Sequence, residues 1–373
     1  MRALRPQQLE LIDALVAQTA LGGITAGLLE KDEHLTDALR ALFAMRLDGM
    51  HLAFCGGTSL SKAHGLIERM SEDADLKIVL AAQTPPLSRT QLRRRLSELK
   101  SAVSETLAGI GLVEDRSRAR TLNENRYFCS EWTYARHYGS VAGLRPHLQI
   151  ELTVRAPVLV TELCQIASLA DQLAGRQDHT FAVATVAVAE TVAEKVLSFL
   201  RRYAQHRAGL LPHEWDTALV RHIYDVYCAH VRDPDIVATA SQAFAALVAG
   251  DQKEFGGQFP DFAAAALLAR SGRPAPTRRS RPSTPAICSP SSTAASSPIL
   301  LKLLSALKRW RWRCWQRLIN HRSINDAVLR LQPWRQTVIA QQFAQFAQFD
   351  LDRPVDLRDR HVVGVGTQAA KMK

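Results

Sequence analysis

Two aspartates, Asp73 and Asp75, stand two residues apart at the start of an apolar run that predicts a strand over 73–80. Successive residues of a strand point to opposite faces of its sheet, so these two carboxylates share one face. Carboxylates that converge repel each other unless a cation lies between them, and hard oxygen ligands favour Mg²⁺. The spacing therefore indicates a magnesium site.

A Gly-Gly-Thr turn, Gly56–Thr58, precedes the two aspartates. The apolar run His51–Cys55 predicts a strand that the glycines stop, and Thr58 can cap a helix that runs to about Arg69. Backbone N–H groups at a helix amino terminus favour phosphate, and glycine permits its close approach. Alone, an Asp-x-Asp pair is usually a solvated strand end and Gly-Gly-Thr a plain turn. Together, and without P-loop spacing, they indicate a phosphate cradle beside a metal site.

The elements that must position these residues follow from the apolar periodicity. It predicts helices over 7–47, 92–112, 187–205, 214–230, 234–249 and 262–270, and strands over 51–55, 73–80, 126–134 and 146–154. The fold class is therefore α+β, with a mixed sheet and helices followed by a helical domain. We predict N-terminal helices over 1–50, an α/β core over 51–160, a helical domain over 185–270, a Ser/Pro-rich linker over 271–299 and a basic, Trp-containing tail over 300–373.

The net charge of +11 suggests a nucleic-acid binder, but it is unevenly distributed. Residues 1–270 hold 29 Lys and Arg against 31 Asp and Glu, whereas residues 271–373 hold 18 against 5. The excess positive charge thus belongs to the tail. Residues 271–299 hold 14 Ser or Pro among 29 residues and no acidic residue, which argues against a packed core. Because the composition of the tail differs so much from that of the rest of the chain, we hypothesise that the tail is a frameshifted or fused extension.

Other classes of protein are excluded by simpler counts. The six cysteines share no close spacing, which rules out a disulfide scaffold and fits a reducing compartment. No run reaches the ~18 apolar residues that a membrane-spanning helix needs, and no signal peptide is apparent. We therefore expect a soluble, cytoplasmic protein without a membrane partner.

Residues 54–76 resemble the first motif of nucleotidyltransferase-fold (polymerase-beta-like) proteins, in which a glycine pair and a hydroxyl residue precede Asp-x-Asp. The fuller string Gly-Gly-Thr-Ser-Leu-Ser-Lys, followed by Arg-Met-Ser-Glu-Asp-Ala-Asp, is similar to the AbiEii/AbiGii family. Members are toxins of type IV toxin–antitoxin and abortive-infection systems. Glu30, Lys31 and Asp32 resemble a Glu-Lys-Asp found upstream in a subgroup of the family. The resemblance covers roughly residues 25–230, and nothing after about 270 shares it.

Three further residues match family positions, and each has a plainer alternative. By strand alternation the Glu151 side chain points away from the apolar face of its strand. It could therefore join Asp73 and Asp75 as a third carboxylate ligand, or simply be an exposed strand glutamate. The resemblance implies that Lys195 holds nucleotide phosphates, although a lysine at the edge of an apolar stripe can also merely snorkel to solvent. Asp225 could pair with Arg221 on its own helix. By resemblance it lines the active site instead, either as general base or to position Lys195.

The resemblance implies a Mg²⁺-dependent nucleotidyltransferase that moves an NMP group from an NTP to an acceptor. The metal ligands would be Asp73, Asp75 and Glu151, the nucleotide-binding residues Gly56, Gly57, Thr58 and Lys195, and the catalytic set those three acids with Lys195 and Asp225. The favoured acceptor is RNA, with tRNA first, and the implied partner is an antitoxin encoded nearby. RNA would then need local patches such as Arg93–Arg95, unless that run is only a solvated helix face. The alternative function is a nucleotide- or RNA-binding module of the same fold without turnover, against which the retained aspartates argue.

Overall fold

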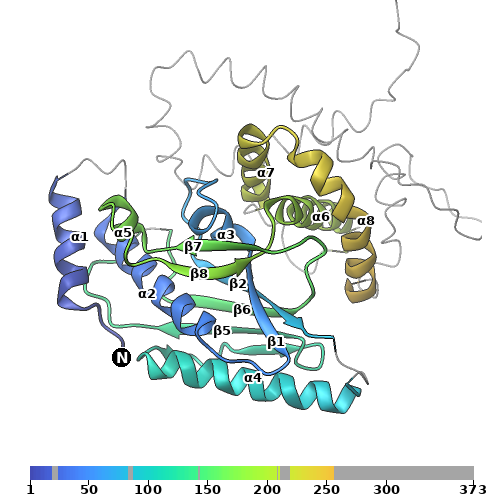
Figure 1. The fold of residues 1–373 in the computed structure, drawn as a ribbon, viewed down its shortest axis with the longest axis horizontal. Helices are drawn as coiled ribbons and strands as arrows, with labels where there is room; N and C mark the ends of the chain where they lie inside the picture. The colour runs from blue at the N-terminus through green and yellow to red at the C-terminus, as the bar shows by residue number, and fades with distance from the viewer. Residues whose placement is uncertain (19–23, 83–86, 142, 208, 211–218, 256–373) are drawn as a thin grey trace, which may run out of the picture.

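The computed structural model describes residues 1–18, 24–82, 87–141, 143–207, 209–210 and 219–255 (Figure 1). The expected helix over 262–270, the linker over 271–299 and the tail over 300–373 lie outside these residues. The strands are β1 (Met50–Cys55), β2 (Asp73–Leu80), β3 (Val113–Glu114), β4 (Arg120–Leu122), β5 (Tyr127–Thr133), β6 (Leu148–Val154), β7 (Glu162–Ile166) and β8 (Phe181–Thr185). The helices are α1 (Pro6–Gln18), α2 (Ala26–Phe43), α3 (Gly56–Lys62), α4 (Arg89–Gly109), α5 (Leu169–Leu173), α6 (Val188–Arg207), α7 (Val220–Arg232) and α8 (Ile236–Phe255).

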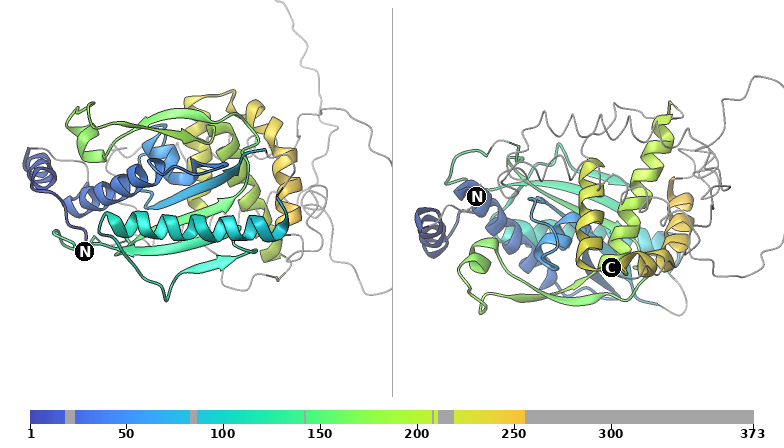
Figure 2. Two further views of the ribbon diagram at one scale, coloured as in Figure 1. Left: turned by 60° about the horizontal axis from the view of Figure 1, so that its bottom comes forward. Right: turned by 90° about the horizontal axis from the view of Figure 1, so that it is seen from above.

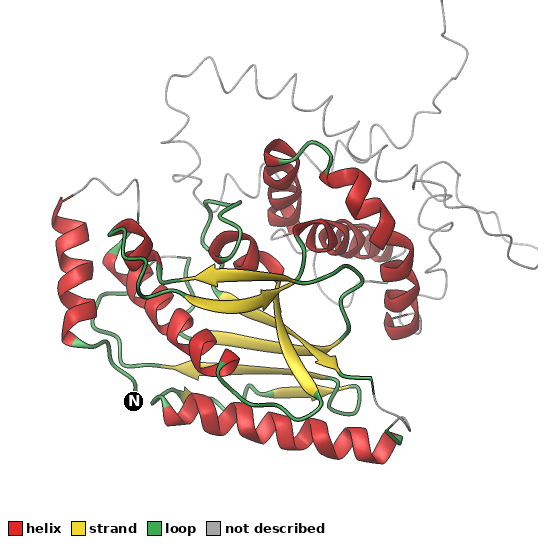
Figure 3. Ribbon diagram, viewed as in Figure 1, coloured by secondary structure: helices red, strands yellow, loops and turns green. Residues whose placement is uncertain are grey.

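All eight strands form one mixed sheet in the order β3-β5-β6-β2-β1-β8-β7, with β4 paired to β5 (Figure 3). Strand β2 lies at its centre, antiparallel to β1 and parallel to β6. The predicted fold class, a mixed sheet with helices followed by further helices, is confirmed. The central place of β2 puts both of its aspartates between neighbouring strands.

The two faces of the sheet differ as the alternation predicts. Ala74, Leu76 and Ile78 of β2 are buried in the main core, together with leucines of α2 and α4. The residues between them, Asp73, Asp75 and Lys77, point to the opposite face. We call that side, which also carries Glu151 of β6, the carboxylate face. Its acids are kept out of the apolar core by the period of two along each strand.

Helices α6, α7 and α8 form a second core of their own, built from residues such as Val192, Leu197, Val226 and Phe244. They lie beside one another in both views of Figure 2. Lys77 of β2 reaches Glu190 and Glu194 of α6, so the carboxylate face looks toward this helical unit. Among the described helices, none is long and apolar enough to cross a membrane.

Several sequence predictions need correction. Helix α3 begins at Gly56 and ends at Lys62, with Cys55 at the N-cap and no side-chain cap, so the predicted cap at Thr58 and the extension to Arg69 are wrong. Strands β3, β4, β7 and β8 and helix α5 were not expected. Because β7 and β8 belong to the sheet, the predicted core boundary at residue 160 falls inside it. These strands are short, and their apolar residues do not alternate cleanly enough to be recognised.

Helix α2 carries five consecutive buried titratable residues, Glu30–His34, which is unusual for a helix. Each charged side chain meets a partner from a distant segment. Glu30 accepts a hydrogen bond from the backbone N–H of His137 at 2.6 Å. Lys62 Nζ, at the end of α3, lies 2.7 Å from Asp32 Oδ1. Helix α2 therefore ties together loops that its apolar side alone would not hold.

The last residue of this run, His34, predicts a pH dependence of stability. Burial, helped by the charge of Arg2, lowers the pKa of His34 from 6.5 to about 3. At pH values between about 3 and 6.5, His34 is therefore protonated in the unfolded chain but not in the folded chain. The stability of the fold consequently falls as the pH drops below 6.5. Between pH 7.5 and 5.0 this residue should remove about 2 kcal/mol of unfolding free energy.

The matching variant is His34→Phe, which keeps a ring against Tyr134, whose centroid lies 4.1 Å away. Urea unfolding at both pH values should show a loss of stability on acidification about 2 kcal/mol smaller than in the wild type. His51→Phe, at an exposed position, serves as the control and should leave the loss unchanged. An equal loss in His34→Phe and the wild type would refute the assignment.

Candidate active site

Three carboxylates meet on two adjacent strands. Strands β2 and β6 run parallel, with Asp75 directly opposite Glu151 and Asp73 opposite Gln149. All three acids belong to the carboxylate face. The interpretation of Glu151 as an isolated surface glutamate does not hold, because it faces Asp75 across the strand pair.

Each of these carboxyl groups resists ionisation. Burial raises the pKa of Asp75 well above its usual range, and the charges of Glu151 and Asp73 raise it further, against the opposing charge of Lys195. Burial also raises the pKa of Glu151, although a hydrogen bond with the Tyr127 hydroxyl opposes the shift. The pKa of Asp73 rises for the same main reason. Burial is the main cause in all three, so a cation bound among these acids would favour their charged forms.

The glycine pair lies against this cluster. A Cβ on Gly56, whose φ is +77°, would lie 2.0 Å from Asp75 Oδ2. A Cβ on Gly57 would lie 2.9 Å from both Arg69 Nη2 and Ser71 Oγ. The backbone of Gly56 therefore lies directly beside the Asp75 carboxylate, and the backbone of Gly57 lies beside the Arg69 guanidinium. Only glycine leaves both groups in place.

A second charged cluster lies at Asp225, whose side chain has no exposed surface. Its Oδ1 accepts a hydrogen bond from Arg69 Nε at 2.8 Å, and its Oδ2 accepts from Arg69 Nη2 at 2.6 Å. Lys195 Nζ is 2.7 Å from the same Oδ2. Burial alone would raise the pKa of Asp225, but Arg69 and Lys195 together hold it below its usual value. Helices α6 and α7 and the segment before β2 are joined at this carboxylate.

Lys77 anchors α6 to the sheet next to the acids. Its Nζ lies 2.7 Å from both Glu190 Oε1 and Glu194 Oε1. The other oxygen of Glu190 accepts the backbone N–H groups of Val158 and Leu159, each at 2.8 Å. Because Lys195 follows Glu194 directly, this anchor fixes the turn of α6 from which Lys195 reaches Asp225.

Arg145, in the loop before β6, covers the first aspartate. Its Nη1 donates to Asp73 Oδ1 at 2.6 Å, and its backbone N–H donates to Glu72 at 2.9 Å. Lys31 of α2 forms an ion pair with the same Glu72 and donates to the Arg145 carbonyl at 2.8 Å. Lys31 of the upstream Glu-Lys-Asp segment thus holds two neighbours of Asp73 in place, Glu72 and Arg145.

The structure places Asp73, Asp75, Glu151 and Gly56 in one cluster, and Lys195 and Asp225 in a second one that Arg69 connects to Gly57. Thr58 is fully buried, and its hydroxyl donates to the Asp73 carbonyl and lies 2.9 Å from the hydroxyl oxygen of Ser71. The Thr58 side chain therefore fixes the segment that leads into β2. Asp225 is bound by Arg69 and Lys195, so the simple pair with Arg221 is not what holds it.

The sequence prediction gave no role to several residues that contact this site, namely Arg69, Tyr127, Arg145, Lys77 and Glu190. Arg69 lies inside the recognised motif, but nothing local distinguishes it from a solvated arginine. Its partner is 156 positions away in the chain. The Arg93–Arg95 run lies on α4, across the sheet from the carboxylate face, where Arg94 pairs with Glu98 at 3.4 Å.

Replacing Gly56 by Ala tests the close approach of backbone to Asp75. The positive φ alone costs about 1–2 kcal/mol for a non-glycine residue. The added Cβ would also displace the Asp75 carboxylate. We expect Gly56→Ala to lower both the melting temperature and the transfer rate, the latter by roughly 100-fold, as for a displacement of about 1 Å.

Gly65→Ala is a matched control for this variant. Gly65 has a φ of +58°, and a Cβ added there would have no atom of the described residues within 4 Å. The variant should lose comparable stability and keep its activity, measured at a temperature where both variants are folded. Equal activities of the two variants would show that the space beside Asp75 is not critical.

Comparison with known proteins places this geometry in context. The family model for the nucleotidyl transferase AbiEii toxin of type IV TA systems matches residues 37–305, more than two thirds of the chain. The match continues past residue 270, so the prediction that nothing beyond it shares the family sequence is wrong. None of the curated proteins matches the chain. Among solved structures it is similar to MenT4, a nucleotidyltransferase toxin from Mycobacterium tuberculosis H37Rv, at 20% identity and a TM-score of 0.33, over 63% of this chain and 77% of that one.

Proposed function

Because the chain belongs to the AbiEii family, the nucleotidyltransferase toxins of type IV toxin–antitoxin systems, we propose that it transfers an NMP group from an NTP to RNA, with Mg²⁺ held by Asp73, Asp75 and Glu151. The observation that carries the proposal is the pairing of Asp75 with Glu151 across two parallel strands, beside Asp73. An antitoxin partner and a nucleotide substrate follow from the family itself.

The donor set fits a magnesium ion. Three carboxylates offer hard oxygen ligands, and their pKa values are raised chiefly by burial, with repulsion between the acids adding to the shift at Asp75 and Glu151. When bound, Mg²⁺ would supply Lewis-acid stabilisation of the negative charge that develops on phosphoryl oxygens. Tyr127, hydrogen-bonded to Glu151, orients that carboxylate from the neighbouring strand.

Lys195 and Arg69 are suited to hold the triphosphate. An ammonium has three donors, so a lysine that gives one to Asp225 can still donate to phosphate oxygens. Arg69 lies against Gly57, where the absence of a side chain lets a phosphate approach both backbone and guanidinium. The lowered pKa of Asp225 and its two cationic partners favour a positioning role over a role as general base. Gly56 and Thr58 shape the same turn.

RNA as acceptor, with tRNA as the first candidate, is supported by local positive charge. Arg145 contacts Asp73, the charge of Arg221 also acts on Asp73, and the charges of Arg120 and Arg202 act on Glu151. These arginines come from four separate segments and act on the same carboxylates. A polyanion could therefore bind at the site even though residues 1–270 are slightly acidic overall.

The test is incubation of the full chain with each of the four α-labelled NTPs, Mg²⁺ and total RNA, with matched reactions lacking RNA or containing chelator. We expect label in an RNA band from at least one NTP and none with chelator. Label on protein but never on RNA would overturn the acceptor. Calorimetric NTP binding without transfer to any acceptor would instead identify a binding module without turnover.

A further inference from the structure

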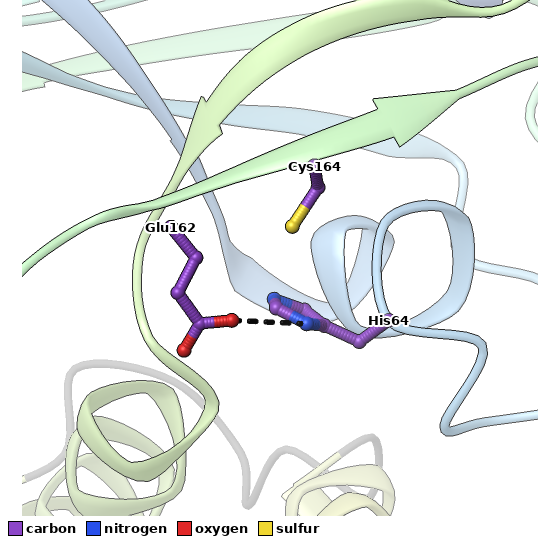
Figure 4. A group of neighbouring side chains, drawn as sticks. All are labelled: His64, Glu162 and Cys164. Atoms are coloured by element: carbon purple, nitrogen blue, oxygen red, sulfur yellow. Dashed lines mark ion pairs between the residues drawn. The ribbon is translucent and has the colours of Figure 1, made fainter.

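Outside the carboxylate face, three side chains of metal-binding type meet at the edge of the sheet (Figure 4). His64 lies in the connection after α3, and Glu162 and Cys164 lie two residues apart on β7. By strand alternation the latter two point to the same side, toward the imidazole. One ligand atom from each residue lies within 4.8 Å of the other two, and His64 Nδ1 is 3.9 Å from Glu162 Oε2.

The histidine is placed as a ligand would be. Its side chain is only 9% exposed, and Nδ1 is the ring nitrogen that faces Glu162. The ring also hydrogen-bonds with the Val186 backbone, and such a second contact is usual for a metal-binding histidine because it fixes the orientation of the ring. Burial lowers the pKa of His64 and so favours the neutral ring, which is the form that binds metals. No residue of the nucleotidyl-transfer site belongs to this cluster.

The donor set selects the metal. One nitrogen, one thiolate sulfur and one carboxylate oxygen suit zinc, whereas a thiolate disfavours Mg²⁺. At zinc bond lengths of about 2.0–2.3 Å, tetrahedral ligand atoms lie about 3.4–3.6 Å apart. The cluster therefore needs to contract by about 1 Å, which the half-exposed Glu162 side chain can provide. Three protein ligands leave the fourth position for water.

We propose that His64, Glu162 and Cys164 bind a zinc ion that fastens the edge strand β7 to the end of α3. On binding, the Cys164 thiol gives up its proton to solvent and its sulfur becomes a ligand. The connection that carries His64 leads on to Arg69 and then to Asp73, so the zinc ion stiffens the segment between the glycine turn and β2. The zinc site shares no ligand with the proposed magnesium site.

The test uses the full chain, stripped with chelator and titrated with Co²⁺, which occupies zinc sites and reports sulfur ligation by a thiolate-to-cobalt charge-transfer band. We expect the band in the wild type, its displacement by Zn²⁺ but not by Mg²⁺, and its loss in Cys164→Ser. Cys228→Ser, which removes another partly buried free thiol, is the matched control and should keep the band.

Glu162→Gln provides a second variant that retains the sulfur. Since even outer-shell partners of a metal change its affinity by roughly 10- to 100-fold, loss of this ligand should weaken Zn²⁺ binding at least about tenfold while the band remains. Zinc should raise the melting temperature of the wild type and not of Cys164→Ser. A wild type without the band, or a band that persists in Cys164→Ser, would overturn the proposal.

Discussion

Replacing Asp75 by Asn is expected to abolish nucleotidyl transfer while making the metal-free protein more stable. Asp75 lies between Glu151 and Asp73, and burial with their charges raises its pKa well above the usual range. Removing one of the three proposed metal ligands should lower the rate by roughly 10³-fold, since each 1.4 kcal/mol of lost transition-state stabilisation is tenfold. Removing the repulsion should raise the unfolding free energy by about 1 kcal/mol, as often happens when an active-site residue is neutralised.

The size of this stability change depends on pH. A carboxyl group whose folded pKa is raised binds more protons in the folded state, so its unfavourable effect develops above its unfolded value of 3.8. Chemical unfolding in chelator should therefore show Asp75→Asn more stable than the wild type near pH 7 and equal to it near pH 4. Added Mg²⁺ should stabilise the wild type alone and close the gap at pH 7.

Asp48→Asn is the control, because that side chain is 98% exposed. It should change neither activity nor stability measurably. If Asp75→Asn transferred label at the wild-type rate, the site assignment would be wrong. If it were inactive but less stable than the wild type in chelator, the carboxylates would not form the mutually repelling cluster described above.

Replacing Asp225 by Asn should reduce both stability and activity. The carboxylate is fully buried and is the shared partner of Arg69 and Lys195. Removing its charge leaves two cations without compensation, a loss of about 3 kcal/mol for a buried pair. Both cations should then shift away from the triphosphate position, and a displacement of about 1 Å can lower the rate by roughly 100-fold. The readouts are urea unfolding and kcat/KM for the NTP.

A matched control is available in Asp251, a buried aspartate of α8 that accepts hydrogen bonds from Arg201 at 2.8 and 2.7 Å. Asp251→Asn should lose similar stability but keep kcat/KM within about twofold, because surface and structural changes away from the site leave catalysis intact. A stability loss in Asp225→Asn with unchanged kcat/KM would make Asp225 purely structural. Restoration of activity at high pH would instead point to a role of Asp225 as general base.

The local pattern determined the carboxylate site itself. The predicted strand over 73–80 matches β2, and Asp73 and Asp75 share a face because side-chain alternation in a strand needs no tertiary information. The same rule placed Glu151 opposite the apolar face of β6, and the order strand, glycine turn, helix and strand was readable from residue types. These are short-range consequences of backbone geometry.

Tertiary structure decided how the charges are paired. Asp225 binds Arg69 across 156 positions of the chain, and Lys77 binds Glu190 across 113, so no local pattern could reveal either pair. The buried charges of α2 were equally unpredictable, since a charged helical run normally faces solvent. Strands β7 and β8 became visible only as partners in the sheet, and with them the cluster of His64, Glu162 and Cys164. The sequence alone thus determined which groups could do chemistry, because alternation along a strand is local. Only the packed chain decided which cation meets which carboxylate, because that depends on contacts between distant segments.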